Sequence, residues 1–243
     1  MKEWFEDWFD SPYYHLLYQN RSDEEATHFV NKITEHLSPN PNATLLDLAC
    51  GKGRHARAFS LYQLDVTGLD LSPQSIEYAK QFENDHLHFY VHDMRNVFRT
   101  NYFDIVCNLF TSFGYFKSNH DNHLAARSMA QALKKGGTLI IDFVNKIPAQ
   151  SHNETFNHET KELQGVHFEI HRSYTEHKLI KSITINDNGV ESQFVEQVNS
   201  FTFEEMNALF TETGLQLVST FGNYAFESYD AHLSPRMILV YTK

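Results

Sequence analysis

Three aspartates follow one another at equal intervals in the first half of the chain. Asp47, Asp70 and Asp93 are separated by 23 residues each time, which is about the length of one strand, one helix and two turns. Each of them ends or follows a short apolar run. Because the carboxyl ends of parallel strands meet at one edge of an open α/β sheet, we expect these carboxylates to line one ligand site.

A glycine-containing segment lies directly after the first of these aspartates. Gly51 and Gly53 would let the backbone turn sharply and approach a ligand closely. The helix expected after them would present free N–H groups and its positive end to that ligand. Asp70 could accept hydrogen bonds from both hydroxyls of a ribose. Together these features predict a site for a nucleoside-bearing cofactor.

More than one nucleoside-bearing cofactor would fit these features. Gly51, Gly53 and Ala56 fit a dinucleotide fingerprint, so an NAD-dependent oxidoreductase is one alternative. Asp47 suits an ammonium group better than a pyrophosphate. Asp93 could accept from an adenine amino group while Met94 packs on the ring. An NAD site leaves both aspartates unexplained.

Short apolar runs alternate with helical patterns over residues 43–146 and would position this site. The runs and the helical stretches between them predict a parallel sheet that is covered on both faces. One helix is expected over residues 121–135, with Lys134 and Lys135 in its last turn and two glycines ending it. The fold class is therefore α/β.

The rhythm changes after residue 146. Asn188 and Gly189 lie between two alternating stretches and indicate a hairpin, so an antiparallel insertion is expected. Thr202 and Glu205 fit a capping box that opens a last helix. We therefore expect four parts: a helical leader or cap (1–42), a cofactor-binding α/β core (43–146), an antiparallel insertion or lid on the acceptor side (147–200), and a last helix with two strands that complete the core sheet (201–243).

In this order and spacing, several segments resemble the class I S-adenosylmethionine-dependent methyltransferases. The similar segments are Leu45–Ala56, Val66–Ser72, Leu87–Met94, Phe103–Phe116 and Leu133–Phe143. The resemblance implies a Rossmann-like, seven-stranded, mostly parallel sheet whose last strand is antiparallel. The leader and the insertion resemble small-molecule members such as glycine and amino-sugar N-methyltransferases. Ala49 departs from the pattern, since many members carry a glycine there.

The resemblance also implies a role for each matching residue. Asp47 would hold the amino group of the cofactor, Asp70 its ribose hydroxyls and Asp93 its adenine amino group. A second set would supply apolar or backbone contacts: Gly51, Gly53, Leu71, Met94, Asn108 and Leu109.

Residues outside the core could complete the site on the leader and acceptor sides. Tyr18 and Arg21 could bind the methionine carboxylate, although a surface helix is an equal alternative for this segment. The acceptor side could include Phe110, Phe113, Tyr14 and Arg172. Candidates for a catalytic role are Asp142 and Tyr115. For Asp142 the alternative is a strand-end ion pair or a cap, and for Arg172 it is the exterior of the sheet.

Composition narrows the classes of partner. The net charge of −11 over 243 residues disfavours nucleic acid and anionic membranes. Cys50 and Cys107 are the two cysteines of the chain, which excludes a disulfide scaffold. No apolar stretch is long enough to span a bilayer, and the first residues lack the layout of a secretory signal. We expect a cytoplasmic protein, and no metal, since the histidines show no convincing ligand spacing.

The sequence thus predicts an enzyme that moves a methyl group from S-adenosyl-L-methionine to nitrogen or oxygen of a small molecule, leaving S-adenosyl-L-homocysteine. An RNA-modifying methyltransferase, an NAD-dependent oxidoreductase and a non-catalytic cofactor-binding module are the alternatives. Neither the acceptor nor the oligomeric state is indicated by the sequence.

Overall fold

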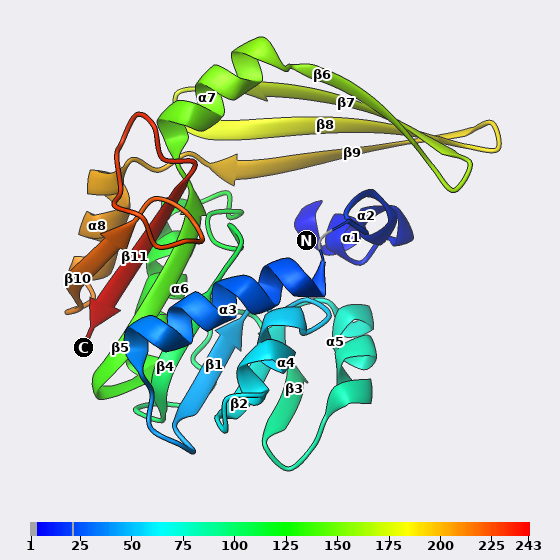
Figure 1. The fold of residues 1–243 in the computed structure, drawn as a ribbon. Coiled ribbons are helices and arrows are strands. Elements are labelled where there is room, and N and C mark those ends of the chain that lie inside the picture. Colours follow the sequence, from blue (N-terminus) through cyan, green and yellow to red (C-terminus); the bar gives the residue numbers. More distant parts are fainter. Residues whose placement is uncertain (1–3, 21) are drawn as a thin grey trace.

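Seven strands form the main sheet of the computed structural model, which describes residues 4–20 and 22–243. Their order is β10-β11-β5-β4-β1-β2-β3 (Figure 1). All pairings among β1 to β5 are parallel, whereas β11 runs antiparallel to both of its neighbours. The bounds are Thr44–Leu48 (β1), Asp65–Asp70 (β2), Leu87–Val91 (β3), Phe103–Asn108 (β4), Leu133–Val144 (β5), Gln216–Phe221 (β10) and Arg236–Thr242 (β11). This confirms the expected Rossmann-like α/β sheet.

Helices cover both faces of the main sheet, so its central strands are apolar on both sides (Figure 1). One apolar cluster joins the sheet to α3 (Asp23–Leu37), α4 (Arg54–Ser60) and α5 (Pro73–Ala79), which a short 3₁₀ helix, η1 (Lys80–Phe82), extends. The other cluster joins it to α6 (Asn119–Ala132) and α8 (Phe203–Thr211). The core therefore consists of two layers, one on each side of the sheet.

Two helices, α5 and α8, begin at the capping residues that the sequence predicts. The hydroxyl of Ser72 accepts from the N–H of Ser75 at 3.0 Å and opens α5. Thr202 and Glu205 make both hydrogen bonds of a capping box at the start of α8. Both predicted helix starts are confirmed.

The end of α6 differs from the expectation. The helix ends at Ala132, and Lys134 and Lys135 belong to β5. Leu133 already pairs with Phe103 of β4, and the register then shifts along the two strands. A Cβ on Gly137 would lie 2.9 Å from the carbonyl oxygen of Lys134. Pairing with β4 thus ends the helix earlier, and the glycine allows the irregular strand that follows.

A second sheet of four antiparallel strands follows α7 (Lys146–Thr155), in the order β6-β7-β8-β9. Its strands are His158–Leu163 (β6), Val166–Tyr174 (β7), Lys178–Asp187 (β8) and Val190–Asn199 (β9). The predicted hairpin is confirmed, because Asn188 and Gly189 join β8 and β9 with φ of 51° and 84°. Strand β6 was not expected, since its sequence is almost entirely polar. Gln164 and Gly165 form its turn with the same left-handed backbone.

Two short leader helices, α1 (Trp4–Phe9) and α2 (Pro12–Leu17), lie beneath the second sheet (Figure 1). Trp8 and Leu17 pack against its inner face, on an apolar cluster that includes Phe168 and Ile183. Phe5 packs instead with the core of the main sheet. The leader therefore fills the space between the two sheets. No helix in the described ranges is long and apolar enough to cross a membrane.

Candidate active site

A cavity of about 520 Å³ lies where β1, β2 and β3 reach their carboxyl ends. Asp47, Asp70 and Asp93 all line it, together with the glycine loop and the leader. This volume is in the range of small-molecule and cofactor sites, about 300–1,000 Å³. The equal spacing in the sequence thus corresponds to three carboxylates around one cavity.

The carboxylate of Asp70 holds the glycine loop in place. Its Oδ2 accepts from the N–H of Gly51 at 2.7 Å, and its Oδ1 accepts from the N–H of Ser72 at 2.8 Å. Gly51 has a φ of 55° and lines the cavity, as does Ala49 with a φ of 63°. A carboxylate oxygen can accept a further hydrogen bond, so Asp70 can position the loop and still bind a ligand.

Gly53 does not line the cavity. It precedes α4 with a φ of 81°, and a Cβ there would lie 2.7 Å from the ring of Phe89. Only glycine fits this combination of backbone angle and close packing. Gly53 therefore serves the packing of the loop on β3 rather than a ligand contact.

Asp47 is a buried carboxylate with an unsatisfied oxygen. The residue is 1% exposed, and its Oδ2 has no hydrogen-bond partner among the residues that the structure describes. Burial raises the pKa of Asp47 to about 7, and the charge of Asp70 adds to the effect. Buried polar atoms are normally satisfied. A ligand amino group in this cavity would supply the missing donor and the compensating charge.

Asp93 has a charged partner of its own. The guanidinium of Arg95 forms an ion pair with it at 2.5 Å. Burial raises the pKa of Asp93, but hydrogen bonds from the side chain and backbone of Arg95 outweigh burial and hold it below its ordinary value. Met94 and Leu71 line the same cavity. The third carboxylate is therefore ionised and shares the cavity with apolar side chains.

The segment after β4 divides its residues between cavity and core. Leu109 and Phe110 line the cavity. Asn108 is fully buried and donates from Nδ2 to the carbonyl of Leu48 at 2.9 Å, which ties the ends of β4 and β1 together. Phe113 packs against Phe210 inside the main core, with 5.6 Å between ring centroids. Neither Asn108 nor Phe113 forms part of the cavity wall.

Asp142 anchors the loop after β4 instead of facing an acceptor. It is fully buried, forms an ion pair with Arg236 at 2.7 Å and accepts from the N–H of Phe110 at 2.7 Å. Phe110 and Thr111 both have a left-handed backbone, with φ of 62° and 59°. Asp142 lines neither of the two cavities described here. Its contacts offset the cost of this strained backbone.

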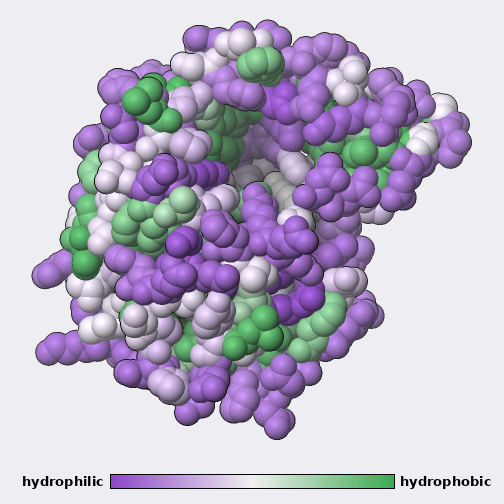
Figure 2. All heavy atoms as spheres, in the orientation of Figure 1, coloured by the Kyte–Doolittle hydropathy of each residue, from purple (hydrophilic) through white to green (hydrophobic). Residues whose placement is uncertain are grey.

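A second cavity, also of about 520 Å³, lies between the second sheet, α7 and the end of β5. Figure 2 shows the molecule hollowed between the second sheet and the core. Arg172 lines this cavity from β7 and pairs with Glu159 of β6. Much of the remaining wall is apolar and comprises Val144, Pro148, Ala149, Leu179, Ile180, Val198 and Pro235.

Tyr115 and Glu196 line both cavities. Glu196 extends from β9 and accepts hydrogen bonds from Nε1 of Trp8 and from the hydroxyl of Tyr18, each at 2.7 Å. Lys181 lies 3.7 Å from its carboxylate. Sequence reasoning missed Glu196, because one acidic residue in an alternating strand does not reveal which face will cover a cavity.

The leader supplies the remaining wall of the first cavity. Tyr18 lines it, and so do Phe9 and His15, which the sequence did not indicate; Tyr14, expected on the acceptor side, lines this first cavity and not the second. Burial lowers the pKa of His15 to about 4, with a contribution from Lys52, so its ring is neutral near pH 7. Arg21 lies outside the described residues. The described part of the leader thus contributes aromatic side chains and a neutral imidazole to the wall of the cavity.

Comparison with known proteins agrees with this geometry. The family model described as "Methyltransferase domain" matches residues 46–141. A dTDP-3-amino-3,4,6-trideoxy-alpha-D-glucopyranose N,N-dimethyltransferase of Streptomyces venezuelae is 32% identical over 131 residues, which are 53% of this chain and 54% of that protein. The chain thus spans about half the length of that relative.

Solved structures resemble the whole fold. A S-adenosylmethionine-dependent methyltransferase from Clostridium acetobutylicum superposes with a TM-score of 0.77 at 16% identity, over 95% of both chains. An amino pentose methyltransferase from Micromonospora echinaspora has a TM-score of 0.68 at 22% identity, over 96% of this chain and 97% of that one. At these identities the likeness shows the fold. Together with the family match, it confirms the resemblance to methyltransferases and favours it over an oxidoreductase.

Proposed function

We propose that this chain, whose residues 46–141 match the family model described as a methyltransferase domain, is a class I S-adenosylmethionine-dependent enzyme that moves the methyl group to an amine nitrogen of a small molecule. One observation carries the proposal. Three strand-end carboxylates and a glycine loop surround one cavity, and a second cavity shares Tyr115 and Glu196 with it. Adjoining sites for two ligands are what group transfer requires.

The residues of the first cavity fit the cofactor. Asp47, with its unsatisfied Oδ2, would hold the amino group. Asp70 would accept from the ribose hydroxyls, and Asp93 from the adenine amino group with Met94 and Leu71 against the ring. Gly51 would face the methionine part, and Tyr18 its carboxylate end. S-adenosylmethionine supplies a methyl group on a positively charged sulfur, so an acidic site suits it.

The chain itself would orient the two ligands and keep water out. Phe9, Phe110 and Tyr115 form an aromatic wall in the first cavity. Aromatic faces stabilise positive charge that disperses as the methyl group moves. Asp142 and Arg236 would take no part in the transfer. Asp142 accepts from the N–H of Phe110 and is itself held by Arg236, so the pair keeps Phe110 in position.

The second cavity would hold the acceptor. Its apolar wall suits the body of a small molecule, and one of its charged residues, Glu196, also lines the first cavity. Glu196 would attract an acceptor amine and orient it towards the first cavity. An amine needs only a free lone pair, so Glu196 is a positioning residue here. The amino-sugar N,N-dimethyltransferase of Streptomyces venezuelae supports an amine rather than a hydroxyl.

The same proposal divides the chain into a helical cap (1–42), a cofactor-binding core (43–146), an acceptor-side insertion (147–200) and a closing segment (201–243). Cys50 and Cys107 are free and buried. Unpaired cysteines are typical of reducing compartments, so we keep the cytoplasm as the expected location. The acidic net charge of −11 is the reason to favour a small molecule over RNA.

Methyl transfer to the acceptors of a cell extract tests the proposal. S-adenosylmethionine with a radiolabelled methyl group is incubated with the protein and the extract, and the products are then separated into small molecules, RNA and protein. We expect label in the small-molecule fraction, in a product that retains basic nitrogen. Label only in RNA would support the RNA-modifying alternative. Cofactor binding without label in any fraction would support a non-catalytic module, and either result would overturn the proposal.

A further inference from the structure

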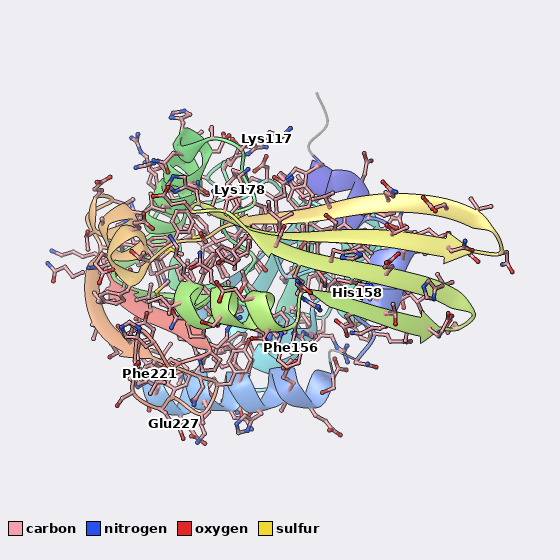
Figure 3. All side chains as sticks on the ribbon, turned by 90° about the horizontal axis from the view of Figure 1, so that it is seen from above. Lys117, Phe156, His158, Lys178, Phe221 and Glu227 are labelled. Carbon is pink, nitrogen blue, oxygen red and sulfur yellow. The ribbon has the colours of Figure 1, made fainter. Side chains whose placement is uncertain are left out.

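Two histidines and a glutamate meet on the outer face of the second sheet, away from both cavities. His158 begins β6, where Figure 3 labels it, and pairs directly with His171 of β7. Glu169 lies two residues before His171 on the same strand, so its side chain points to the same face. The three side chains are 44–56% exposed. They form a cluster that the proposed methyl transfer does not use.

The distances within this cluster match a metal coordination sphere. The Nε2 atoms of His158 and His171 each lie 3.2 Å from Oε1 of Glu169. One ligand atom from each residue can be chosen so that all three lie within 4.8 Å of one another. A tetrahedral zinc ion with bonds of about 2.0–2.1 Å separates its ligand atoms by about 3.3 Å. Small side-chain rotations would therefore suffice to bind an ion.

We propose that His158, Glu169 and His171 form a binding site for a zinc-like divalent transition-metal ion. A site of two imidazoles and one carboxylate binds such ions in preference to Mg²⁺ or Ca²⁺. Their exposure leaves the fourth position to water and gives the ion a path from solvent.

The ion would link the edge strand of the second sheet to its neighbour. Strand β6 is the edge of the second sheet, and its side chains are largely polar. On the opposite face, Glu159 pairs with Arg172, one residue along from each histidine. Arg172 lines the second cavity. A metal bridge between β6 and β7 would therefore fix the strand that supports the wall of this cavity.

The sequence alone could not reveal this site. His167 and His171 share a face of one strand. His158 lies on the preceding strand, and only the register of β6 and β7 shows that it pairs with His171. His167 contacts Glu162 at 2.6 Å instead and lies outside the trio. It therefore provides a matched control on the same strand and face.

Calorimetric titration of the untagged chain with ZnCl₂, in a buffer that does not bind metals, tests the proposal. We expect one ion per chain with micromolar affinity, and weakening by roughly tenfold or more in His158→Gln and in His171→Gln. His167→Gln should bind as the unmodified chain does. Glu169→Gln has the same shape as the parent, so it should keep the fold while losing affinity.

Titration with Co²⁺ gives a second readout, because the visible absorption of the ion reports histidine ligation and low coordination number. We expect this absorption in the parent and in His167→Gln, and its loss in His171→Gln. Zinc affinity that is unchanged in both trio histidine variants would overturn the site. Equal weakening in His167→Gln, or equally tight binding of Mg²⁺, would show diffuse surface binding and would overturn it as well.

Discussion

The hydroxyl of Tyr18 donates a hydrogen bond of 2.7 Å to the carboxylate of Glu196. Tyr18 follows the leader helix α2, and Glu196 belongs to β9 of the second sheet. Both residues line the acidic cavity, and Glu196 also lines the neighbouring one. This contact joins two segments that are distant in the sequence. It lies where the two proposed ligand sites adjoin, because Glu196 lines both of them.

Glu196→Gln tests this border. Glutamine keeps the shape but loses the charge that would attract an acceptor amine. Once an acceptor is identified, we expect kcat/KM for it to fall by about tenfold or more, while the Kd for S-adenosylhomocysteine changes by less than about threefold. Steady-state kinetics and calorimetry measure the two effects. Glu191→Gln, on the outer face of the same strand, is the control. A loss confined to cofactor affinity would contradict the assignment.

Asp47 predicts a pH dependence of cofactor binding. Its pKa of about 7 means that the free carboxyl is protonated in mildly acidic solution and ionised in mildly basic solution. A bound ammonium group favours the ionised form. Affinity for S-adenosylhomocysteine should therefore rise from about pH 6 to about pH 8, by up to about tenfold per unit below the pKa. Asp47→Asn should bind more weakly and lose this dependence. The same slope in parent and variant would rule out Asp47 as its origin.

Asp142 predicts a large effect on stability. Asp142→Ala leaves Arg236, whose side chain is 17% exposed, without its counter-ion and the N–H of Phe110 without its acceptor. Breaking a buried ion pair costs about 3–5 kcal/mol, which urea denaturation will measure. Glu35→Ala removes the exposed partner of Lys32 and should cost less than about 1 kcal/mol. Similar losses in the two variants would be inconsistent with the anchoring role.

The two loop glycines should respond differently to alanine. Gly53→Ala combines a left-handed backbone with a contact of 2.7 Å to Phe89, so we expect a loss of about 2–4 kcal/mol. Gly51→Ala has a φ of 55° but no atom within 4 Å of the added carbon, so a loss of about 1 kcal/mol is expected. Denaturation midpoints measure both. Greater destabilisation by Gly51→Ala would refute this division of roles.

The sheet, its crossovers and the three strand-end carboxylates could be predicted because their signals are local. Asp70 ends a buried strand, and Ser72 caps the helix that follows, within a few residues. The parallel arrangement then brings Asp47, Asp70 and Asp93 to one edge without further information.

Residues whose place depends on packing between distant segments could not be assigned in this way. For Asp142 the sequence left an acceptor-side role and a strand-end ion pair as alternatives, and the partner, Arg236, is brought to it only when β11 pairs with β5. Phe110 and Phe113 are equally aromatic, but the left-handed turn at Phe110 sends one to the cavity and the other to the core. Glu196 lies at the two cavities because the second sheet packs over the leader, a contact that the local sequence does not indicate.

Calorimetric titration with S-adenosylhomocysteine tests the central claim most directly, which is that the carboxylates at the ends of β1, β2 and β3 bind an adenosyl cofactor. We expect one molecule per chain with micromolar affinity, and a loss of at least about tenfold in Asp70→Ala. Asp65→Ala, at the opposite end of β2, should bind as the parent does. Binding of NAD in place of S-adenosylhomocysteine, or an affinity unchanged by Asp70→Ala, would contradict the claim.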